Sequence, residues 1–314
     1  MKRKLNIAKK VHLWIGLISG LIASLSGLNG ALYVWQPELS RALNPEILSV
    51  RGAETLKEET IHKTAYELYR NFGDNLLAIH LPNREQQSIQ LVLENGESRF
   101  FHPQTGNMLG EKTSSIRFFE GLLSFHRTLL IPKYGKYLVG GSAVLFFSLL
   151  LTSGSFFTFM PTYKRALRIL DEPVKTAEAT TKNEPLTHVY PEQVLSLPPQ
   201  DGYKLRAVYF PTEASGHYRF RYIKDRVITA GLRKTKQVQI NQNYEVIMST
   251  DFRQSQLSEK IVAQVYPIHI GETLGLFGWM LVFITGFIPT ILSTTGYRFY
   301  LHYRHRLSAR TDGR

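Results

Sequence analysis

Four histidines of this sequence lie at or near the ends of long apolar segments, where an imidazole could serve as a metal ligand. They are His12, His126, His269 and His302, and His305 follows one helical turn after the last of them. The chain contains no cysteine, which excludes disulfides, thiolate ligands and dithiol redox chemistry. Any electron or metal chemistry must therefore use histidine, carboxylate, tyrosine or a bound cofactor.

The first apolar segment combines its histidine with small residues at helical spacing. His12, Gly16 and Gly20 are four residues apart, so a helix places the imidazole above a strip without side chains. The same strip continues through Ser24, Gly27 and Ala31. Two interpretations stay open. Small residues at this spacing are typical of helix-packing faces, but they also give the flat wall that a haem needs, with neutral imidazole as its axial ligand.

Other chemistries have less support. A zinc site needs three or four nearby ligands, and only His302 and His305 form a local pair. The sequence has no G-x-S-x-G, Walker A or H-E-x-x-H motif, and its apolar segments contain no charged residue that would mark an ion path. The other histidines lie in hydrophilic segments, where a structural or solvated role is expected: His62, His80, His102, His188 and His217.

Three segments predict membrane-spanning helices. Residues 11–35, 137–160 and 273–296 each run for 24 or 25 residues without Asp, Glu, Lys or Arg, and about 20 apolar residues cross a bilayer core as a helix. Five positive charges precede the first segment, which is longer than the roughly 7 to 15 residues of a signal-peptide core. We therefore expect an uncleaved anchor with a cytoplasmic amino terminus.

The hydrophilic segments predict two small α+β modules with a common plan. In the first, residues 59–73 have helical spacing and three strand-like stretches follow, within 76–82, 88–96 and 98–111. In the second, a short helix at 190–197 precedes strand-like stretches within 203–212, 217–225 and 234–251. The expected parts are a basic start and first span (1–36), a first module (37–125), a second span (126–160), a second module (161–268), and a third span with a basic tail (269–314).

An internal duplication is expected to extend into the membrane. His126 is followed nine residues later by Gly135, and His269 is followed nine residues later by Gly278. Each copy then ends in a small polar motif, Thr152-Ser153-Gly154 or Thr294-Thr295-Gly296.

Charge gives conflicting evidence on topology. Residues 37–125 carry 9 Lys and Arg against 12 Asp and Glu, whereas residues 161–268 carry 16 against 11. The positive-inside rule thus places the first module outside and the second inside, in agreement with three crossings. The basic tail after Gly296 favours the inside, which three crossings cannot provide, and residues 161–200 are too charged for a return span. Ten positive charges lie before the first span or after the third, where basic flanks normally set the orientation in the membrane. The net charge of +13 therefore does not lead us to expect nucleic-acid binding.

The topology also decides which histidines pair. Three crossings place His12 and His269 inside, and they place His126 and His302 outside. A fourth crossing would instead place His12 with His302 inside, and His126 with His269 outside. Because a bilayer core of about 30 Å is too thick for one haem to link both faces, two haems are the expected inventory of a transmembrane relay.

These segments resemble the PepSY-associated transmembrane family. The resemblance lies in residues 12–45, 125–154 and 268–296, and residues 100–111 look like a PepSY strand pair. Family members commonly have a fourth span directly after the second, which this sequence lacks. The family includes iron-regulated inner-membrane proteins and ferric siderophore reductases.

The resemblance implies a multi-pass protein of the bacterial inner membrane. It implies b-type haem with axial ligands from His12, His126, His269 and His302. The implied activity is electron transfer from an unknown donor across the bilayer to a ferric siderophore or other iron chelate. The alternative is a non-enzymatic membrane module whose paired α+β domains bind a partner protein or restrain a protease.

Overall fold

The computed structural model describes residues 2–154, 190–196, 201–212, 215–226 and 230–312. The chain divides into two compact units. Unit 1 contains Met1–Tyr33, Glu120–Thr180 and Phe283–Arg314, and unit 2 contains Val34–Phe119 and Thr181–Val282. Both hydrophilic segments therefore contribute to one unit.

Unit 1 consists of apolar helices. Among its described residues, the main helices are α1 (Lys2–Tyr33), the end of α5 (Ser114–Thr128), α6 (Gly135–Gly154) and α11 (Ile288–Asp312). Among the residues that the structure describes, two segments are long and apolar enough to cross a membrane, Val11–Tyr33 and Glu272–His302, and Gly135–Leu151 is a shorter apolar helix. The last part of the predicted second span, residues 155–160, lies outside the described residues.

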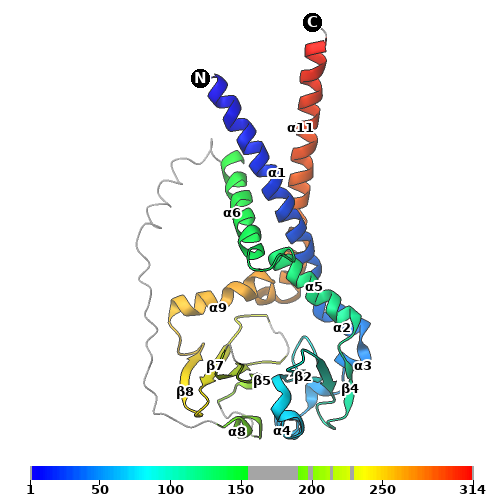
Figure 1. Cartoon of the computed structure of the whole chain (residues 1–314), viewed down its shortest axis with the longest axis vertical. Helices are drawn as coiled ribbons and strands as arrows, with labels where there is room; N and C mark the ends of the chain where they lie inside the picture. Colours follow the sequence, from blue (N-terminus) through cyan, green and yellow to red (C-terminus); the bar gives the residue numbers. More distant parts are fainter. Residues whose placement is uncertain (1, 155–189, 197–200, 213–214, 227–229, 313–314) are drawn as a thin grey trace. The chain divides into compact units, whose positions relative to one another are not determined.

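Within unit 1, α6 and α11 both run antiparallel to α1, so the amino terminus of α1 and the carboxyl terminus of α11 lie at the same end (Figure 1). The contacts along α1 establish these directions: Gly16 with Leu149, Gly20 with Phe146 and Ser293, and Gly27 with Gly286. Successive crossings alternate in direction, so three crossings would make α6 and α11 antiparallel to each other. The expected three-crossing arrangement therefore does not fit. Residues 161–189, judged too charged for a return span, lie outside the described residues.

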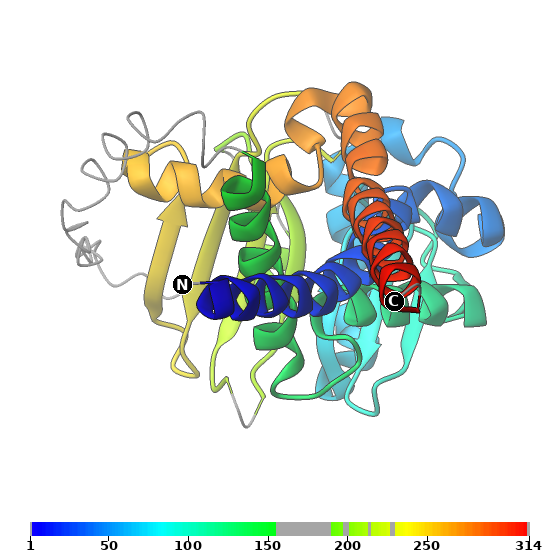
Figure 2. The same cartoon turned by 90° about the horizontal axis from the view of Figure 1, so that it is seen from above.

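Unit 2 is built around one antiparallel sheet of eight strands, in the order β4-β3-β2-β1-β5-β6-β7-β8. In Figure 2 its strands pass from yellow at one edge to cyan at the other. The first four strands are β1 (Leu76–His80), β2 (Ile89–Leu93), β3 (Ser98–Phe101) and β4 (Met108–Glu111). The second four are β5 (Lys204–Tyr209), β6 (Tyr218–Ile223), β7 (Thr235–Ile240) and β8 (Val246–Asp251).

Short helices complete this unit. They are α2 (Gln36–Leu43), α3 (Pro45–Leu48), α4 (Glu58–Phe72), α8 (Pro191–Ser196), α9 (Leu257–His269) and the start of α10 (Gly275–Thr285), with 3-10 turns at Ala53–Thr55, Gly73–Asn75 and Glu272–Leu274. The helix and strand periods of both hydrophilic segments are thus confirmed.

The two expected modules share one sheet because their first strands pair. Ile79 of β1 lies opposite Val208 of β5, and this pairing joins two meanders of four strands. Each meander alone would leave its first strand with unpaired backbone groups. The expectation that charge separates the modules onto opposite sides of the membrane is therefore wrong.

A single core confirms this union. It combines Ile61 of α4 and Leu91 of β2 with Leu205 of β5 and Phe220 of β6, each at most 1 % exposed. Apolar burial contributes about 25 cal/mol per Å². Because residues of both meanders form this core, either meander alone would lose part of that stabilisation.

The two copies also repeat a helix and a glycine turn after their last strands. His126 lies in the last turn of α5, and His269 lies in the last turn of α9. In both copies the glycine nine residues later packs on the backbone seven residues before it: a Cβ on Gly135 would overlap the carbonyl oxygen of Thr128, and one on Gly278 would overlap that of Gly271. The predicted spacing of nine residues thus reflects a turn that only glycine permits.

The predicted third span is divided between α10 and α11, and its leading part through Val282 belongs to unit 2. There the guanidinium carbon of Arg84 lies 3.7 Å from the centre of the Trp279 indole, and Arg233 forms an ion pair with Glu272. Residues 283–302 remain, and a helix of about 20 residues spans about 30 Å.

Candidate functional site

His126 is held against α1 by two hydrogen bonds. Its ring nitrogen Nδ1 donates to the backbone carbonyl of Ser26 over 2.8 Å, and the Ser26 hydroxyl donates to the backbone carbonyl of His126 over 3.0 Å. Because Nδ1 carries the proton, the lone pair of the neutral ring lies on Nε2. Metal-binding histidines usually have this arrangement, in which a backbone carbonyl fixes the tautomer and orients the ring.

Gly30 makes room for this ring. A Cβ at Gly30 would lie 2.7 Å from Cε1 of His126 and 2.9 Å from Nδ1. A side chain there would therefore displace the imidazole from Ser26. No sequence pattern indicates Ser26 or Gly30 as site residues, although Gly30 lies close to the strip that ends at Ala31.

His12 lies at the other end of α1, on the wall of an apolar pocket among α1, α6 and α11. The pocket has a volume of 270 Å³, and His12 and Gly16 line it together with Gly296 and Tyr300 of α11. Ligand pockets commonly measure about 300–1,000 Å³, so the volume of this pocket lies just below that range.

The strip on α1 serves two purposes along its length. From Gly20 onward it is a helix-packing face, because a Cβ on Gly20 or Gly27 would lie 2.6 Å from an oxygen of α11 or of the segment before it. Ala31 is 2 % exposed. At Gly16 the nearest atom is 3.7 Å away. The packing interpretation therefore holds for the strip from Gly20 to Ala31. Within the strip, space for a ligand remains around His12 and Gly16.

The four predicted histidines occupy different places. His12 and His302 lie toward the same end of unit 1, because α1 and α11 are antiparallel, whereas His126 lies toward the opposite end. The pairing of His126 with His302 expected from three crossings does not fit these positions. His302 is exposed, and His269 belongs to unit 2, where it is exposed on α9.

Two histidines of the hydrophilic segments, His62 and His102, make structural contacts. His62 is completely buried in α4, and its Nδ1 lies 3.2 Å from the carbonyl of Leu195. Burial lowers the pKa of His62, and the positive charge of Arg226 lowers it further. His102 accepts backbone N–H bonds from Gln104 and Thr105 and stabilises the turn before β4. His188 lies outside the described residues.

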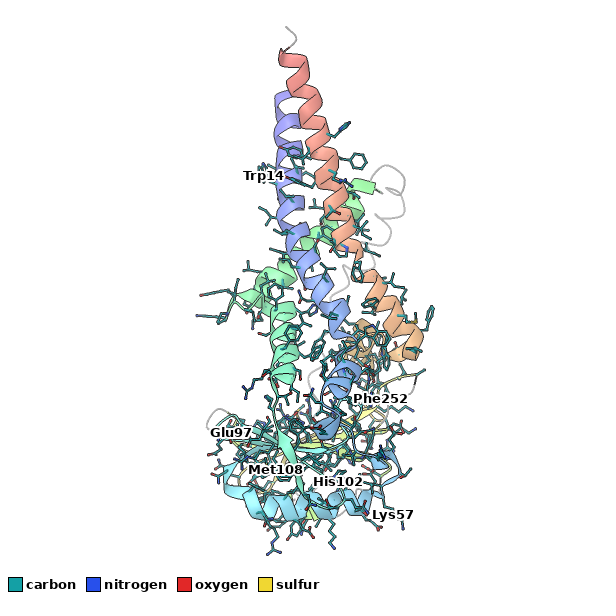
Figure 3. The ribbon with its side chains drawn as sticks, turned by 90° about the vertical axis from the view of Figure 1, so that its right-hand side faces the viewer. Trp14, Lys57, Glu97, His102, Met108 and Phe252 are labelled. Atoms are coloured by element: carbon teal, nitrogen blue, oxygen red, sulfur yellow. The ribbon has the colours of Figure 1, made fainter. Side chains whose placement is uncertain are left out.

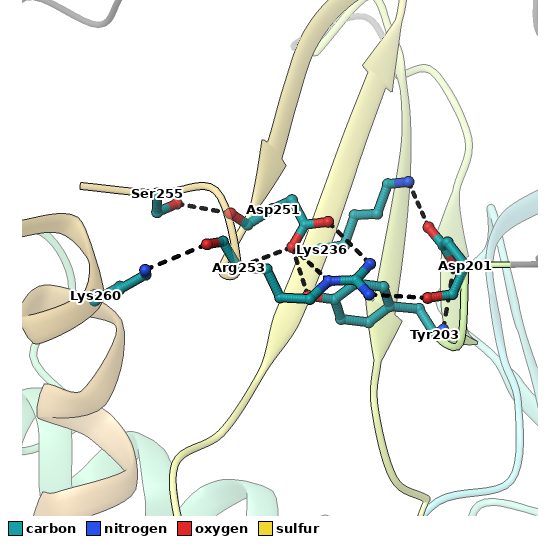
Figure 4. Close-up of polar contacts among 7 residues, drawn as sticks. All are labelled: Asp201, Tyr203, Lys236, Asp251, Arg253, Ser255 and Lys260. Atoms are coloured by element: carbon teal, nitrogen blue, oxygen red, sulfur yellow. Dashed lines mark hydrogen bonds and ion pairs between the residues drawn. The ribbon is translucent and has the colours of Figure 1, made fainter. Parts of the chain in front are cut away.

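The helix that carries His269 is fixed to the sheet by a polar network (Figure 4). Tyr203 donates to the Asp251 carboxylate over 2.6 Å, and Arg253 bonds the same carboxylate while its guanidinium lies 4.5 Å from the Tyr203 ring centre. Lys260 of α9 donates to the carbonyl of Arg253 over 3.3 Å. The start of α9 is thereby connected to β8.

Charge stabilises this network. Burial raises the pKa of Tyr203 to about 12, with the hydrogen bond to Asp251 as the next cause. Burial alone would also raise the pKa of Asp251, but the bonds from Tyr203 and Arg253 outweigh it and hold that pKa below its ordinary value. Lys236 has the same effect on Asp201, to which it donates over 2.7 Å.

Unit 1 thus has two candidate haem-ligand histidines, one toward each end. His126 has an oriented ring with its lone pair on Nε2, and His12 borders an apolar pocket with a glycine on the same face. Apolar walls and an oriented imidazole are what a b-type haem requires. Gly20 contacts α11 and Gly27 contacts the segment before α11. These contacts are too close for a macrocycle to lie between α1 and α11 at this level.

Comparison with known proteins assigns the chain to a family. The model of the PepSY-associated TM region matches residues 9–167 and, a second time, residues 145–302. The chain therefore belongs to this family of membrane proteins, and the two matches agree with the duplicated helix, sheet and glycine-turn geometry. No curated protein matches the chain.

Proposed function

We propose that this protein is a bacterial inner-membrane b-haem oxidoreductase that passes electrons across the bilayer to a ferric siderophore or another ferric chelate. The observation that carries this proposal is the 2.8 Å bond from His126 Nδ1 to the Ser26 carbonyl, inside a unit of apolar helices. Histidine side chains also hydrogen-bond across packed helices, so it is the fixed tautomer, with its lone pair on Nε2, that supports a ligand role for this imidazole. Family membership supports the membrane location.

The proposed residue roles follow from the two ends of unit 1. His126 would be an axial ligand at one end, and Ser26 would hold its tautomer. His12 would be a ligand at the other end, where it lines the apolar pocket. His302, which lies two residues beyond the pocket residue Tyr300 on α11, would be its partner. His269 remains a ligand predicted from the sequence. When bound, haem supplies one-electron transfer. Siderophore oxygens prefer hard Fe(III) to Fe(II), so reduction would promote iron release.

Chain direction supports a topology for this function. Positive charges before Val11 favour a cytoplasmic start, which places the Tyr33 end of α1 outside. Val34, the first residue of unit 2, directly follows this end of α1. Gly286 lies four residues after the last residue of unit 2 and contacts Gly27, near the same end of α1. Both segments of unit 2 therefore begin or end on the outer side, and the basic tail of α11 would lie inside. This arrangement implies an even number of crossings.

Spectroscopy of the purified full chain tests the proposal. Protein from haem-replete cells should show a Soret band and, after dithionite reduction, b-type α and β bands with about two haems per chain. His12→Ala and His126→Ala should each remove about one haem, while the control His217→Ala, outside the proposed ligands, should keep both. A colourless folded protein would refute the proposal.

A second candidate function is the binding of a partner protein at the sheet edge. Strand β8 is an edge strand, and Ile247 and Met248 on it are 46 % and 45 % exposed. Met108 is exposed on the opposite edge strand β4 (Figure 3). Exposed edges of this kind accept an extended segment of another chain.

The two functions predict different mutant phenotypes. If binding is the function, Ile247→Lys should abolish it, whereas His12→Ala and His126→Ala should leave it intact. Leu257→Lys, at a residue 74 % exposed on α9, is the matched control. Loss of the phenotype only in the histidine variants would favour electron transfer.

A further inference from the structure

Unit 2 contains a second, polar pocket that the electron relay does not use. It has a volume of 420 Å³ and is lined by α2, α4, the loop between β1 and β2, the start of β5, the segment at Arg226 and Trp279. This volume lies within the range of about 300–1,000 Å³ that is common for small-molecule sites. Its lining differs from that of the pocket beside His12, because charged side chains dominate it.

Two ion-pair clusters line this pocket. In the first, Glu58 is bonded by Arg226 through two bonds of 3.0 and 2.6 Å and lies 3.4 Å from Lys204. In the second, Glu38 lies 3.3 Å from Arg84 and 3.6 Å from Arg41. Each cluster combines one carboxylate with two cations. Each therefore keeps a net charge of about +1.

The carboxylate of Glu58 stays ionised in this position. Burial raises its pKa, but the hydrogen bond and charge of Arg226, followed by the charge of Lys204, outweigh burial and lower it below its ordinary value. Arg226 also donates over 2.6 Å to the carbonyl of Pro82, which fixes its guanidinium. The positive excess of this cluster thus has a defined location.

Two buried donors at the second cluster have no partner among the described residues. They are Nε of Arg84 and Nε1 of Trp279, and the Arg84 guanidinium lies 3.7 Å from the centre of the Trp279 ring. Only 13 % of the Arg84 side chain is exposed. Buried N–H groups are normally hydrogen-bonded, so these two donors point to an acceptor supplied by a ligand.

Two further acidic residues, Glu54 and Asp225, also line the pocket and are both exposed. Solvent screens exposed charges more strongly than partly buried ones. The partly buried cations, Arg84 and Arg226 above all, therefore act most strongly on an anion in the pocket.

We propose that this pocket binds a small dicarboxylate, with one carboxylate at Arg84 and Trp279 and the other at Lys204 and Arg226. Two separate clusters with one net positive charge each match two separated single negative charges better than one doubly charged phosphate. Arginine forks also suit the planar carboxylate geometry. The site goes beyond the proposed electron relay, because it involves no histidine of unit 1 and no haem.

Isothermal titration of the purified full chain with succinate tests the proposal. Wild-type protein should bind succinate saturably, and butyrate, which has one carboxylate, should bind at least tenfold more weakly. Phosphate should also bind more weakly than succinate. Absence of saturable succinate binding, or tighter binding of phosphate, would overturn the proposal. Haem content is measured separately, so failure here leaves the proposed oxidoreductase untouched.

Two variants test the residue assignment. Arg84→Lys keeps the charge but removes the fork and Nε, and it should weaken succinate binding about tenfold. Lys204→Gln should have a similar effect through the other cluster. Arg221→Lys, which changes an exposed arginine of β6, is the control and should bind within twofold of wild type. If thermal melting shows that a variant is unfolded, the ligand series on wild-type protein still decides. Unchanged affinity in both folded variants would overturn the assignment.

Discussion

Nδ1 of His126 lies 2.8 Å from the backbone carbonyl of Ser26, one hundred residues earlier in the chain. The bond connects the last turn of α5 to the last third of α1. It fixes both the position and the tautomer of the ring, as at metal-binding histidines. The space for the ring comes from the absent side chain of Gly30.

Gly30→Ala should displace this imidazole. The new Cβ would lie 2.7 Å from Cε1, so the ring must move and its bond to Ser26 must lengthen or break. Overpacking of this kind typically costs about 1–3 kcal/mol. We expect a lower melting temperature and about one haem fewer per chain. Gly140→Ala is the control, because no atom lies within 4 Å of its Cβ position. Equal behaviour of the two variants would refute the role of Gly30.

Gly16 and Gly27 should respond differently to alanine, although both belong to the predicted strip. At Gly27 a Cβ would lie 2.6 Å from the backbone oxygen of Gly286, which cannot rotate away, whereas at Gly16 the nearest atom is 3.7 Å away. Gly27→Ala should therefore destabilise unit 1 by about 1–3 kcal/mol, and Gly16→Ala should be close to neutral. Thermal melting in detergent measures both. Equal melting temperatures would mean that the helices do not pack as observed.

Gly16→Leu would then separate packing from cofactor binding. Its side chain would enter the 270 Å³ pocket beside His12. We expect loss of haem at this end with a melting temperature near that of wild type. A loss of stability without a loss of haem would favour packing as the purpose of the whole strip.

Local periodicity made most elements predictable from the sequence. Alternating residues such as Leu91 and Leu93 identify strands, and apolar runs identify α1 and α6, because burial selects side chains on one face or on all faces. The pairing of β1 with β5 was not predictable in this way. It joins residues more than 120 positions apart, such as Ile79 and Val208, and depends on which edges remain open after each meander forms.

The candidate site was predictable in part for a similar reason. The spacing of His126 and Gly135 marks a turn whose glycine is required locally, so the sequence reveals it. The contact with Ser26 depends on how α5 meets α1, and no local pattern encodes that. Loop charge predicted opposite sides for two segments that share one sheet, because the positive-inside rule applies to short loops and not to folded domains.

Reporter fusions should place unit 2 outside and the tail inside. Alkaline phosphatase fused after Tyr190 should be active, and a green fluorescent protein fused after Arg314 should fluoresce, because α6 and α11 run in the same direction. The reciprocal fusions should be inactive. Fluorescence of a fusion after Tyr190 would restore the three-crossing arrangement.

Tyr203→Phe should loosen the connection between the sheet and α9. It removes the 2.6 Å bond to the Asp251 carboxylate, and hydrogen bonds to charged groups contribute about 1.5–3 kcal/mol. Because Arg253 still bonds the carboxylate, we expect a loss of about 1–2 kcal/mol, measured by thermal melting followed through tryptophan fluorescence. Tyr190→Phe, at a residue 41 % exposed, is the control. Identical melting of both variants would show that the network does not support α9.

Acidification should destabilise unit 2 through His80 before its carboxylates titrate. Burial lowers the pKa of His80 from 6.5 to about 4, with Arg206 and Arg221 adding to the effect and Glu85 opposing it. A lowered histidine pKa means that the unfolded chain binds the proton first. The contribution of neutral His80 to the stability of unit 2 is therefore complete above pH 6.5 and is lost as the pH falls toward 4.

The size of this effect sets the measurement. Between pH 6.5 and 5 the free energy of unfolding should fall by about 1.6 kcal/mol from His80, which corresponds to about 3–6 °C in melting temperature for a unit of this size. His62 contributes with the same sign, because its pKa is also lowered. His80→Phe keeps a ring against Tyr209, whose centre lies 5.5 Å away, but cannot titrate. It should reduce the slope in this pH range, and an unchanged slope would show that His80 is not the titrating group.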